Sequence, residues 1–292
     1  MGDLSKFHWG ERTYVMGILN VTPDSFSGDG LISHDDVVEA ALEQARSFIT
    51  DGADILDVGG ESTRPGHQAI SSDEEISRVV PVIRAIRAET GLTISIDTYK
   101  ADVAEAALDA GADWINDVWG MRADPLMAPL AAKEKAPVIL MHNRSKPEEV
   151  AFQNILGGSY IGANYQDLIG EVKSELMGSV DLALRAGVPK DQIILDPGIG
   201  FGKTVDQNLE LINRLNEICG LGYPILLGPS RKSFIGYTLD LPPQERIEGT
   251  AASIAIGILR GASIIRVHDV KQMMRVARMT DAILHSGRKP QV

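Results

Sequence analysis

The segment 194–204, ILDPGIGFGKT, places a carboxylate, Asp196, directly before a glycine-rich loop that ends in Lys203 and Thr204. Glycines followed by Lys-Thr suggest a phosphate-binding P-loop, which requires another glycine five residues before the glycine of the Gly-Lys pair. That position is Pro197, which has no N–H to offer a phosphate and fixes its own φ angle. The sequence therefore does not predict a P-loop, and the aspartate that ends an apolar run becomes the more informative feature.

Polar side chains end each of the short apolar runs along the chain. These runs cover residues 13–20, 54–60, 93–98, 113–118, 137–142, 192–197, 223–228 and 263–268. Their final polar residues are Asn20, Glu61 with Ser62, Asp97, Asn116 with Asp117, His142, Asp196, the region of Lys232, and Arg266 with His268. One such residue is more often a helix cap or a satisfied core group. A full set of eight indicates a site.

The runs themselves predict strands, because they are too short for buried helices and rich in Ile and Val, as in strands covered on both faces. Segments with helical periodicity, such as 35–50 and 73–89, alternate with them. Glycine recurs before the following strand in DGAD (51–54), AGAD (110–113) and RGAS (260–263), as expected for the residue just past a helix end.

Eight strands alternating with helices predict parallel pairing and an α/β fold of the (β/α)₈ TIM-barrel class. We expect one domain over 1–292, with the barrel core at about 13–285, since no linker divides the chain. The competing fold is an open doubly wound sheet, and the lack of a Gly-x-Gly-x-x-Gly turn after the first strand argues against its dinucleotide-binding form. The longest connection, 143–163, is expected to be a mobile loop.

The composition limits the classes of molecule that the protein is expected to bind. A net charge of −12 over 292 residues argues against nucleic acid and anionic membrane, although a small anionic substrate stays possible where cations gather locally. No run approaches the ~18 apolar residues that a membrane span needs. Cys219 is the only cysteine, so no intrachain disulfide can form and a cytoplasmic location fits.

The strand-end residues sort by chemistry. Asp97, Asn116 and Asp196 would meet at the barrel mouth and suit a flat heterocycle with adjacent N–H donors, since a carboxylate accepts two parallel hydrogen bonds. Helix N-capping is the alternative role for each aspartate. Arg266 and His268 alternate on the last strand, where barrels often bind phosphate. Asn20 could bind Mg²⁺, which takes few protein ligands.

Further cations and two glycine-rich loops border the expected mouth. Arg231 and Lys232 follow the seventh strand, although Arg231 could equally lie on the surface. The loops fall within 21–34 and 60–72, and their composition is typical of lids that close on substrate. Such lids would present Phe26, Thr63, Arg64 and Pro65.

Eight segments together resemble the dihydropteroate synthase family, in order from about residue 13 to 285 and most weakly in 143–175 and 237–248. They are MGILNVTPDSFSGDG, DILDVGGESTRPG, SIDTYK, INDV, LMHNR, LDPGIGFGKT, GPSRKSFIG and IIRVHDV. The resemblance implies a (β/α)₈ barrel that joins 6-hydroxymethyl-7,8-dihydropterin diphosphate to para-aminobenzoate and releases diphosphate in folate biosynthesis. It also implies a cytoplasmic homodimer and sulfonamide binding in place of para-aminobenzoate.

The resemblance also implies the roles of site residues. The pterin would be held by Asp97, Asn116, Met141, Asp196, Phe201, Gly228 and Lys232. The diphosphate would be held by Asn20, Thr63, Arg64, Arg266 and His268, with Mg²⁺ on Asn20. The para-aminobenzoate site would use Phe26, Thr63, Pro65, Phe201, Lys232 and Ser233. The catalytic set would be Asp97, Lys232, Arg266 and His268.

Two departures and three rival functions remain open. Ser27-Gly28-Asp29-Gly30 differs from the usual Ser-Asp-Gly-Gly order, and Trp119 stands where a smaller residue is expected. The rivals are a pterin barrel that transfers a methyl group to a corrinoid protein, a Schiff-base aldolase using Lys232, and an inactive pterin-binding partner. The apolar segment 249–259 could pack in a dimer or be a buried core helix.

Overall fold

The computed structural model describes residues 4–22, 34–62, 69–146, 150–153, 156–160 and 164–287. Its main sheet has eight parallel strands, each paired with the next along the chain. They are β1 (Tyr14–Asn20), β2 (Ile55–Gly59), β3 (Thr93–Asp97), β4 (Trp114–Asp117), β5 (Val138–Met141), β8 (Ile193–Asp196), β9 (Leu226–Leu227) and β10 (Ile264–Val267). A parallel bridge between Leu195 and Ile225 joins β8 to the segment that enters β9 and closes the barrel. The predicted TIM barrel is confirmed.

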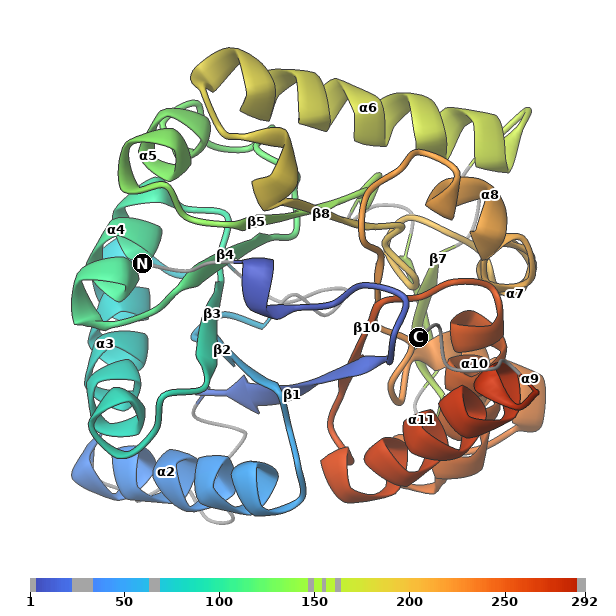
Figure 1. The fold of residues 1–292 in the computed structure, drawn as a ribbon, viewed down its shortest axis with the longest axis horizontal. Coiled ribbons are helices and arrows are strands. Elements are labelled where there is room, and N and C mark those ends of the chain that lie inside the picture. Colours follow the sequence, from blue (N-terminus) through green and yellow to red (C-terminus); the bar gives the residue numbers. More distant parts are fainter. Residues whose placement is uncertain are drawn as a thin grey trace.

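Helices ring the barrel (Figure 1). They are α2 (His34–Thr50), α3 (Ser72–Glu89), α4 (Ala101–Ala110), α5 (Met127–Glu134), α6 (Leu168–Ala186), α7 (Val205–Asn213), α8 (Leu215–Cys219), α9 (Ser233–Leu239), α10 (Ile247–Leu259) and α11 (Val270–His285). Gly52, Gly111 and Gly261 have φ angles of 94°, 113° and 104°, as predicted for the residue that turns a helix towards the next strand. The predicted strand at 223–228 is shorter, because hydrogen bonding assigns only Leu226 and Leu227 to β9.

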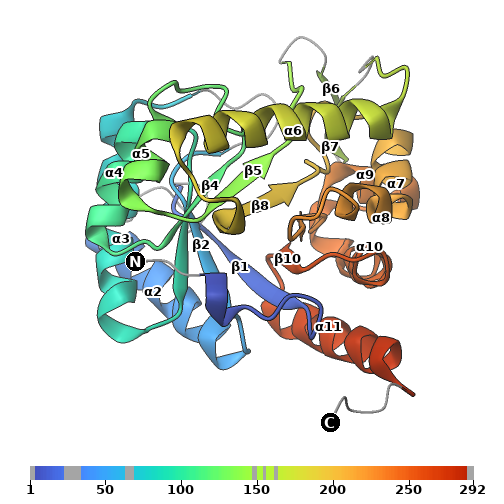
Figure 2. The same cartoon turned by 45° about the horizontal axis from the view of Figure 1, so that its top comes forward.

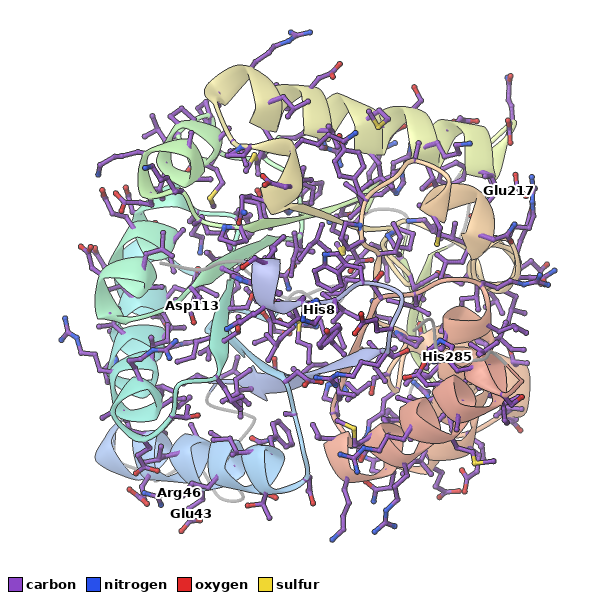
Figure 3. The ribbon with its side chains drawn as sticks, in the orientation of Figure 1. His8, Glu43, Arg46, Asp113, Glu217 and His285 are labelled. Carbon is purple, nitrogen blue, oxygen red and sulfur yellow. The ribbon has the colours of Figure 1, made fainter. Side chains whose placement is uncertain are left out.

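The barrel interior has an apolar end and a polar end. Alternate residues on each strand face inward, and the inward residues at the amino ends of the strands form one buried apolar cluster that includes Met16, Trp114 and Ile264. Leu4, in the short helix η1 (Leu4–Lys6), and Phe7 complete that cluster, so the amino-terminal segment covers this end, with His8 above it (Figures 1 and 3). The carboxyl ends of the strands are therefore the open end at which a site can form.

The long connection after β5 includes regular structure that the sequence did not predict. It contains an antiparallel hairpin of β6 (Val150–Gln153) and β7 (Gly157–Tyr160). Figure 2 shows this hairpin at the opposite end of the barrel from η1. Arg246 secures it, since its guanidinium donates hydrogen bonds to the carbonyls of Leu156 (3.0 Å) and Arg231 (3.0 Å).

Charged side chains cover the outer helix faces, as for Glu43 and Arg46 on α2 (Figure 3). In the described part of the chain, no helix combines the length and the apolar character that crossing a bilayer would require.

Candidate functional site

The open end of the barrel gathers polar inward-facing residues from nearly every strand. Side chains two positions apart on a strand face the same way, so each inward-facing apolar residue is followed by an inward-facing residue nearer the open end. The apolar residues Ile55, Trp114, Ile194 and Ile264 are followed in this way by Asp57, Asn116, Asp196 and Arg266. By the same alternation, the inward-facing positions also include Asn20, Asp97, Met141, Gly228 and His268. These include all of the strand-borne residues that the sequence assigned to pterin and diphosphate.

Arg266 is the centre of this set. Its Nε lies 2.6 Å from Oδ2 of Asp57, and its Nη2 lies 2.5 Å from Oδ2 of Asp97. Asn116 donates a second hydrogen bond to the same Asp57 oxygen, at 3.1 Å. Five strands thus contribute to one buried cluster, in which Arg266 is the cation among three carboxylates when Asp196 is included. Pairing a guanidinium with carboxylates makes their burial tolerable.

Two carboxylate oxygens in this cluster face no donor among the described residues. Oδ1 of Asp57 and Oδ1 of Asp97 are both buried and accept no hydrogen bond there. Buried acceptors without donors cost free energy, so they are typical of places where a bound molecule supplies the N–H groups. The cluster therefore suits a ligand with a donor edge.

Burial also alters the protonation of the cluster. It raises the pKa of Asp97 to about 7, although Arg266 opposes the rise, and it raises the pKa of Asp196. Burial would lower the pKa of Arg266, but Asp57 and Asp97 hold it above its ordinary value. Perturbed groups gathered in one place indicate a functional site.

Lys232 stands beside Asp196 and the glycine-rich loop. It precedes α9, its ammonium donates to the carbonyl of Ile199, and it lies 4.3 Å from the centroid of the Phe201 ring. Burial lowers the pKa of Lys232 to about 8, while Asp196 opposes this change. Asp196 accepts a hydrogen bond from the Gly198 N–H at 2.7 Å. A carboxylate, an ammonium and an aromatic ring thus converge, as the sequence predicted.

His268 and Asn20 lie at the edge of the cluster. Nδ1 of His268 is 3.0 Å from Oγ of Ser230, which also accepts from the His268 backbone N–H at 3.2 Å. Asn20 pairs with Gly59, which in turn pairs with Asp97. A Cβ at Gly59 would lie 3.4 Å from Cβ of Asp97, so the missing side chain leaves room between Asn20 and Asp97.

Helix capping does not explain the aspartates. Asp97 binds Arg266, and the following helix α4 begins after Lys100. Asp196 lies before the glycine loop, and Thr204 caps α7 instead through a capping box with Gln207. The alternative role weighed for these residues is therefore wrong.

Two strand-end residues that the sequence counted with the mouth, Asp117 and His142, lie elsewhere, and Arg231, for which a surface position was open, also pairs outside the cluster. Asp117 accepts the backbone N–H groups of Trp119 and Met121, and so shapes a turn on the outward side of β4. His142 is buried against Lys203, away from the inward face. Arg231 pairs with Asp269. Asp117 and His142 fall on the outward-facing side of the strand alternation, and Arg231 lies beyond the end of β9.

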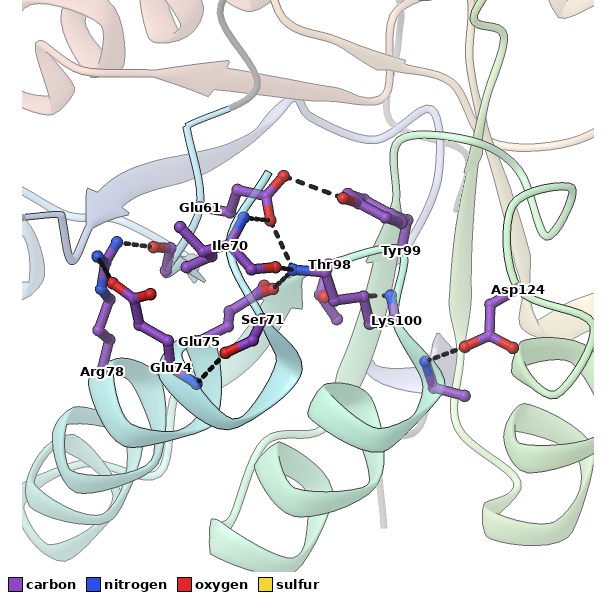
Figure 4. Close-up of polar contacts among 12 residues, drawn as sticks. Glu61, Ile70, Ser71, Glu74, Glu75, Arg78, Thr98, Tyr99, Lys100 and Asp124 are labelled. Atoms are coloured by element: carbon purple, nitrogen blue, oxygen red, sulfur yellow. Dashed lines mark hydrogen bonds and ion pairs between the residues drawn. The ribbon is translucent and has the colours of Figure 1, made fainter. Parts of the chain in front are cut away.

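Glu61 belongs to a separate network at the base of the second loop (Figure 4). Lys100 donates to Glu61 (2.6 Å), to Glu75 (2.7 Å) and to the carbonyl of Ile70 (2.7 Å), while Tyr99 donates to Glu61 at 3.0 Å. Lys100 thus ties together the two chain segments on either side of residues 63–68. Phe26, Thr63, Arg64 and Pro65 lie outside the described residues.

Asp57 is the site residue that sequence reasoning missed. It lies inside the strand in DILDVGG and not at the strand end, where the mouth residues were expected. The signal was available, since Asp57 is two positions before Gly59 and shares its face. A fully buried carboxylate in the middle of an apolar strand needs a cation, and Arg266 is that cation.

Comparisons with known proteins agree with this arrangement. The family model described as "Pterin binding enzyme" matches residues 16–268. The dihydropteroate synthase of Bacillus subtilis is 53% identical, over 97% of this chain and 93% of its own. The crystal structure of dihydropteroate synthase from Clostridium difficile with pteroic acid has a TM-score of 0.86 at 49% identity, covering 97% of this chain and 100% of that one.

A third comparison is with a structure that contains a different ligand. The Xanthomonas albilineans dihydropteroate synthase with 4-aminobenzoic acid has a TM-score of 0.84 at 39% identity, over 94% of this chain and 93% of that one. Identity at this level over almost the whole length confirms the resemblance that the eight segments indicated. The chain belongs to the dihydropteroate synthase family of pterin-binding enzymes.

Proposed function

We propose that this chain condenses 6-hydroxymethyl-7,8-dihydropterin diphosphate with para-aminobenzoate to give 7,8-dihydropteroate and diphosphate. The observation that carries the proposal is the cluster at the barrel mouth. There, buried carboxylate oxygens that accept no hydrogen bond from the described residues lie near the cations Arg266 and Lys232. One molecule with a donor-rich heterocycle and an anionic leaving group would satisfy both kinds of group. Family membership supports the same reaction.

The pterin would bind across Asp97, Asn116, Asp196 and Lys232, with Asp57 behind them. Oδ1 of Asp57 and of Asp97 would accept ring N–H groups. In this proposal Met141, Gly228 and Phe201 line the pocket. The backbone of Gly228 lies against the cluster, since a Cβ built there would be 3.7 Å from Cβ of Arg266. This position fits a residue that lines the pocket.

The diphosphate would bind to Asn20, Arg266 and His268, joined by Thr63 and Arg64. Arg266 has N–H groups left after its two carboxylate bonds, because a guanidinium carries five donors. The contact between Ser230 and Nδ1 fixes the orientation of the His268 ring at the edge of the cluster.

Magnesium would bind at Asn20. The described residues contain no group of three His, Cys, Asp or Glu side chains able to hold a metal ion. One amide oxygen fits Mg²⁺ only when the diphosphate and waters supply most of its ligands, which is its common mode with phosphates. The bound ion would neutralise charge on the leaving diphosphate.

The reaction would proceed by dissociative substitution. The bond between the pterin methylene and the diphosphate oxygen breaks, both electrons leave with the diphosphate, and the ring delocalises the resulting cation. Asp97 stabilises that cation, while Arg266 and His268 stabilise the departing anion. The arylamine nitrogen then attacks the methylene and loses a proton. Phe26, Thr63, Pro65, Phe201, Lys232 and Ser233 would hold the aminobenzoate and exclude water.

The function is tested by incubating purified protein with both substrates and Mg²⁺ and identifying dihydropteroate by mass spectrometry. Asp196→Asn is expected to reduce the product, since it removes the carboxylate that faces the pterin donors. Asp206→Asn, on α7 outside the cluster, is the matched control. Wild-type protein that binds the pterin substrate and yields no dihydropteroate would sink the proposal.

The pH dependence of kcat/KM should be a narrow bell with its maximum between about 7 and 8. Asp97 must be ionised, and its raised pKa of about 7 gives an acidic limb on which activity falls as pH decreases. Lys232 must be protonated, and its lowered pKa of about 8 gives a basic limb on which activity falls as pH increases. These limbs are properties of a cluster that also contains Asp57, Asp196 and Arg266.

Steady-state assays from pH 5 to 10 measure this profile. The residual activity of Asp97→Asn should lack the acidic limb and keep the basic one. An acidic limb that is unchanged in Asp97→Asn would show that another group controls it.

We also propose a homodimer through α10 and α11. Ile254 and Ile258 of α10 are buried against the barrel, whereas Ile256 and Leu259 are 43% and 54% exposed. On the adjacent α11, Met279 and Ile283 expose 62% and 60%. Exposed apolar side chains gathered on neighbouring helices are typical of subunit interfaces. A cytoplasmic location stays a prediction from the single cysteine.

Ile256→Glu is expected to convert the dimer to a monomer, because it would bury a charge in an apolar interface. Sedimentation equilibrium measures the change, with Leu126→Glu as the control, since Leu126 is an exposed apolar residue before α5. A wild-type monomer, or a dimer that persists in Ile256→Glu, would contradict the proposal.

A further inference from the structure

The loop between β8 and α7, residues 197–204, depends on three left-handed glycines. Gly198, Gly200 and Gly202 have φ angles of 70°, 80° and 61°. A Cβ at Gly198 would lie 1.8 Å from the carbonyl oxygen of His142, which no relaxation could accommodate cheaply. The Phe201 N–H donates to the Gly198 carbonyl at 3.1 Å and closes a tight turn. Such a loop leaves its carbonyls to be satisfied by other groups.

Lys203 supplies those donors from inside the loop. Its side chain is only 2% exposed, and its ammonium donates to the carbonyls of Gly198 (2.8 Å) and Phe201 (3.0 Å). The third ammonium N–H reaches Nδ1 of His142 at 3.0 Å. A P-loop lysine reaches a phosphate, whereas this lysine is turned inward and bonds its own loop. All three of its donors are used.

His142 and Glu175 extend this arrangement to α6. Nε2 of His142 lies 3.1 Å from Oε2 of Glu175. Glu175 also pairs with Arg144, and these partners lower the pKa of Glu175 to about 2, so it is ionised at neutral pH. An ionised Glu175 favours a proton on Nε2, which leaves Nδ1 of His142 as an acceptor for Lys203. Burial lowers the pKa of His142 to about 4, which keeps the ring neutral.

The two carbonyls that Lys203 binds flank the part of the loop that meets the site. Ile199, between them, presents its carbonyl to the Lys232 ammonium. Phe201 presents its ring to the same ammonium, with 4.3 Å between the nitrogen and the ring centroid. A Cβ at Gly200 would lie 2.7 Å from Cδ of Lys232, so the loop and Lys232 are in close contact. A shift of the loop would therefore move Phe201 and Lys232 together.

We propose that Lys203, oriented by His142 and Glu175, is a positioning residue that fixes Ile199 and Phe201 against Lys232 and so shapes the aminobenzoate part of the site. The inference rests on the proposed function for the identity of that ligand. Lys203 acts through the loop and touches no substrate. Phe201 and Lys232 also border the proposed pterin site, but Asp97, Asn116 and Asp196 hold the pterin without the loop. Loss of Lys203 should therefore affect the aminobenzoate half of the ligand more than the pterin half.

Lys203→Met keeps the length of the side chain and removes its donors. We expect kcat/KM for para-aminobenzoate to fall about 10²-fold, the usual effect of a small misplacement near the reacting groups. The dissociation constant of pteroic acid, measured by calorimetry, should rise about tenfold. That of 6-hydroxymethylpterin should stay within about threefold. Lys133→Met, an exposed surface change, is the control.

A pair of His142 variants separates positioning from general instability. Asn at position 142 places an amide oxygen near the site of Nδ1 and keeps the acceptor for Lys203. Gln places its amide near Nε2 and keeps only the contact to Glu175. Thermal unfolding of both should change to a similar extent, whereas pteroic acid should bind His142→Asn more tightly than His142→Gln.

Equal affinity of these two variants for pteroic acid, or a Lys203→Met variant that weakens both ligands alike, would overturn the positioning role. The binding measurements need no turnover. If wild-type protein binds pteroic acid and yet makes no dihydropteroate, the proposed function fails while the positioning role can still be decided.

Discussion

Asp97→Asn is expected to lower kcat by about 10²–10³-fold while dihydropterin diphosphate still binds, since removing one preorganised electrostatic contact typically has this effect. The change keeps the size of the side chain and removes its negative charge. Oδ1 of Asp97 is buried and faces no donor among the described residues, so it is placed to act on the ligand. A developing cation on the pterin would lose its nearest compensating charge.

Single-turnover kinetics and equilibrium binding of the pterin substrate measure the two quantities separately. The carboxylate of Asp113 pairs with Arg87 near the opposite ends of the strands, so Asp113→Asn controls for the loss of a partly buried aspartate. Turnover close to that of the wild type, with pterin binding intact, would show that Asp97 does not stabilise the transition state.

Arg266→Met should be more damaging, with kcat/KM at least about 10³-fold lower, because Arg266 serves both the acid cluster and the leaving group. It should also lower the free energy of unfolding by about 3 kcal/mol, since Asp57 and Asp97 would be left buried without their cation. Part of this cost would be avoided by protonation of one carboxylate.

The double variant Arg266→Met with Asp97→Asn tests the physical cause. Removing one of the two unpaired carboxylates should recover part of the stability and none of the activity. Chemical denaturation and steady-state assays provide the measurements, with Arg231→Met as the control, since that arginine pairs with Asp269 outside the cluster. An unfolding free energy equal to that of the wild type in Arg266→Met would show that burial of Asp57 and Asp97 does not depend on this cation.

The fold could be predicted from sequence because its signals are local and repeated. Eight short apolar runs and glycines such as Gly111 and Gly261 each follow from backbone geometry, and the order of strands follows from parallel pairing with short connections. The hairpin β6–β7 was missed because its strands lack an alternating apolar pattern. The hydrogen bond from Arg246 to Leu156 that holds it comes from a residue 90 positions away, so it is a tertiary effect.

The site was predictable to the extent that strand parity was applied. Asp97, Asn116, Asp196 and Arg266 were identified correctly as mouth residues. His142 was placed among them because it ends a strand, although its position on β5 is one residue beyond the inward-facing Met141. The alternation of side chains along β5 alone would have excluded His142 from the mouth residues.

Partners across the barrel could not be inferred in the same way. Asp57 and Arg266 are 209 residues apart, and nothing local shows that they meet. Lys203 likewise belongs to a sequence that resembles a phosphate loop, and only the course of the chain shows that its ammonium is turned inward. The roles of Phe26, Thr63, Arg64 and Pro65 stay predictions from family resemblance.

Diphosphate release by the purified protein, with dihydropterin diphosphate and Mg²⁺ and with or without para-aminobenzoate, tests the central claim most directly. We predict that release in the presence of para-aminobenzoate matches dihydropteroate formation one for one. Tight pterin binding without any release of diphosphate would contradict the account and favour a barrel that binds pterin for another purpose, such as methyl transfer to a corrinoid protein.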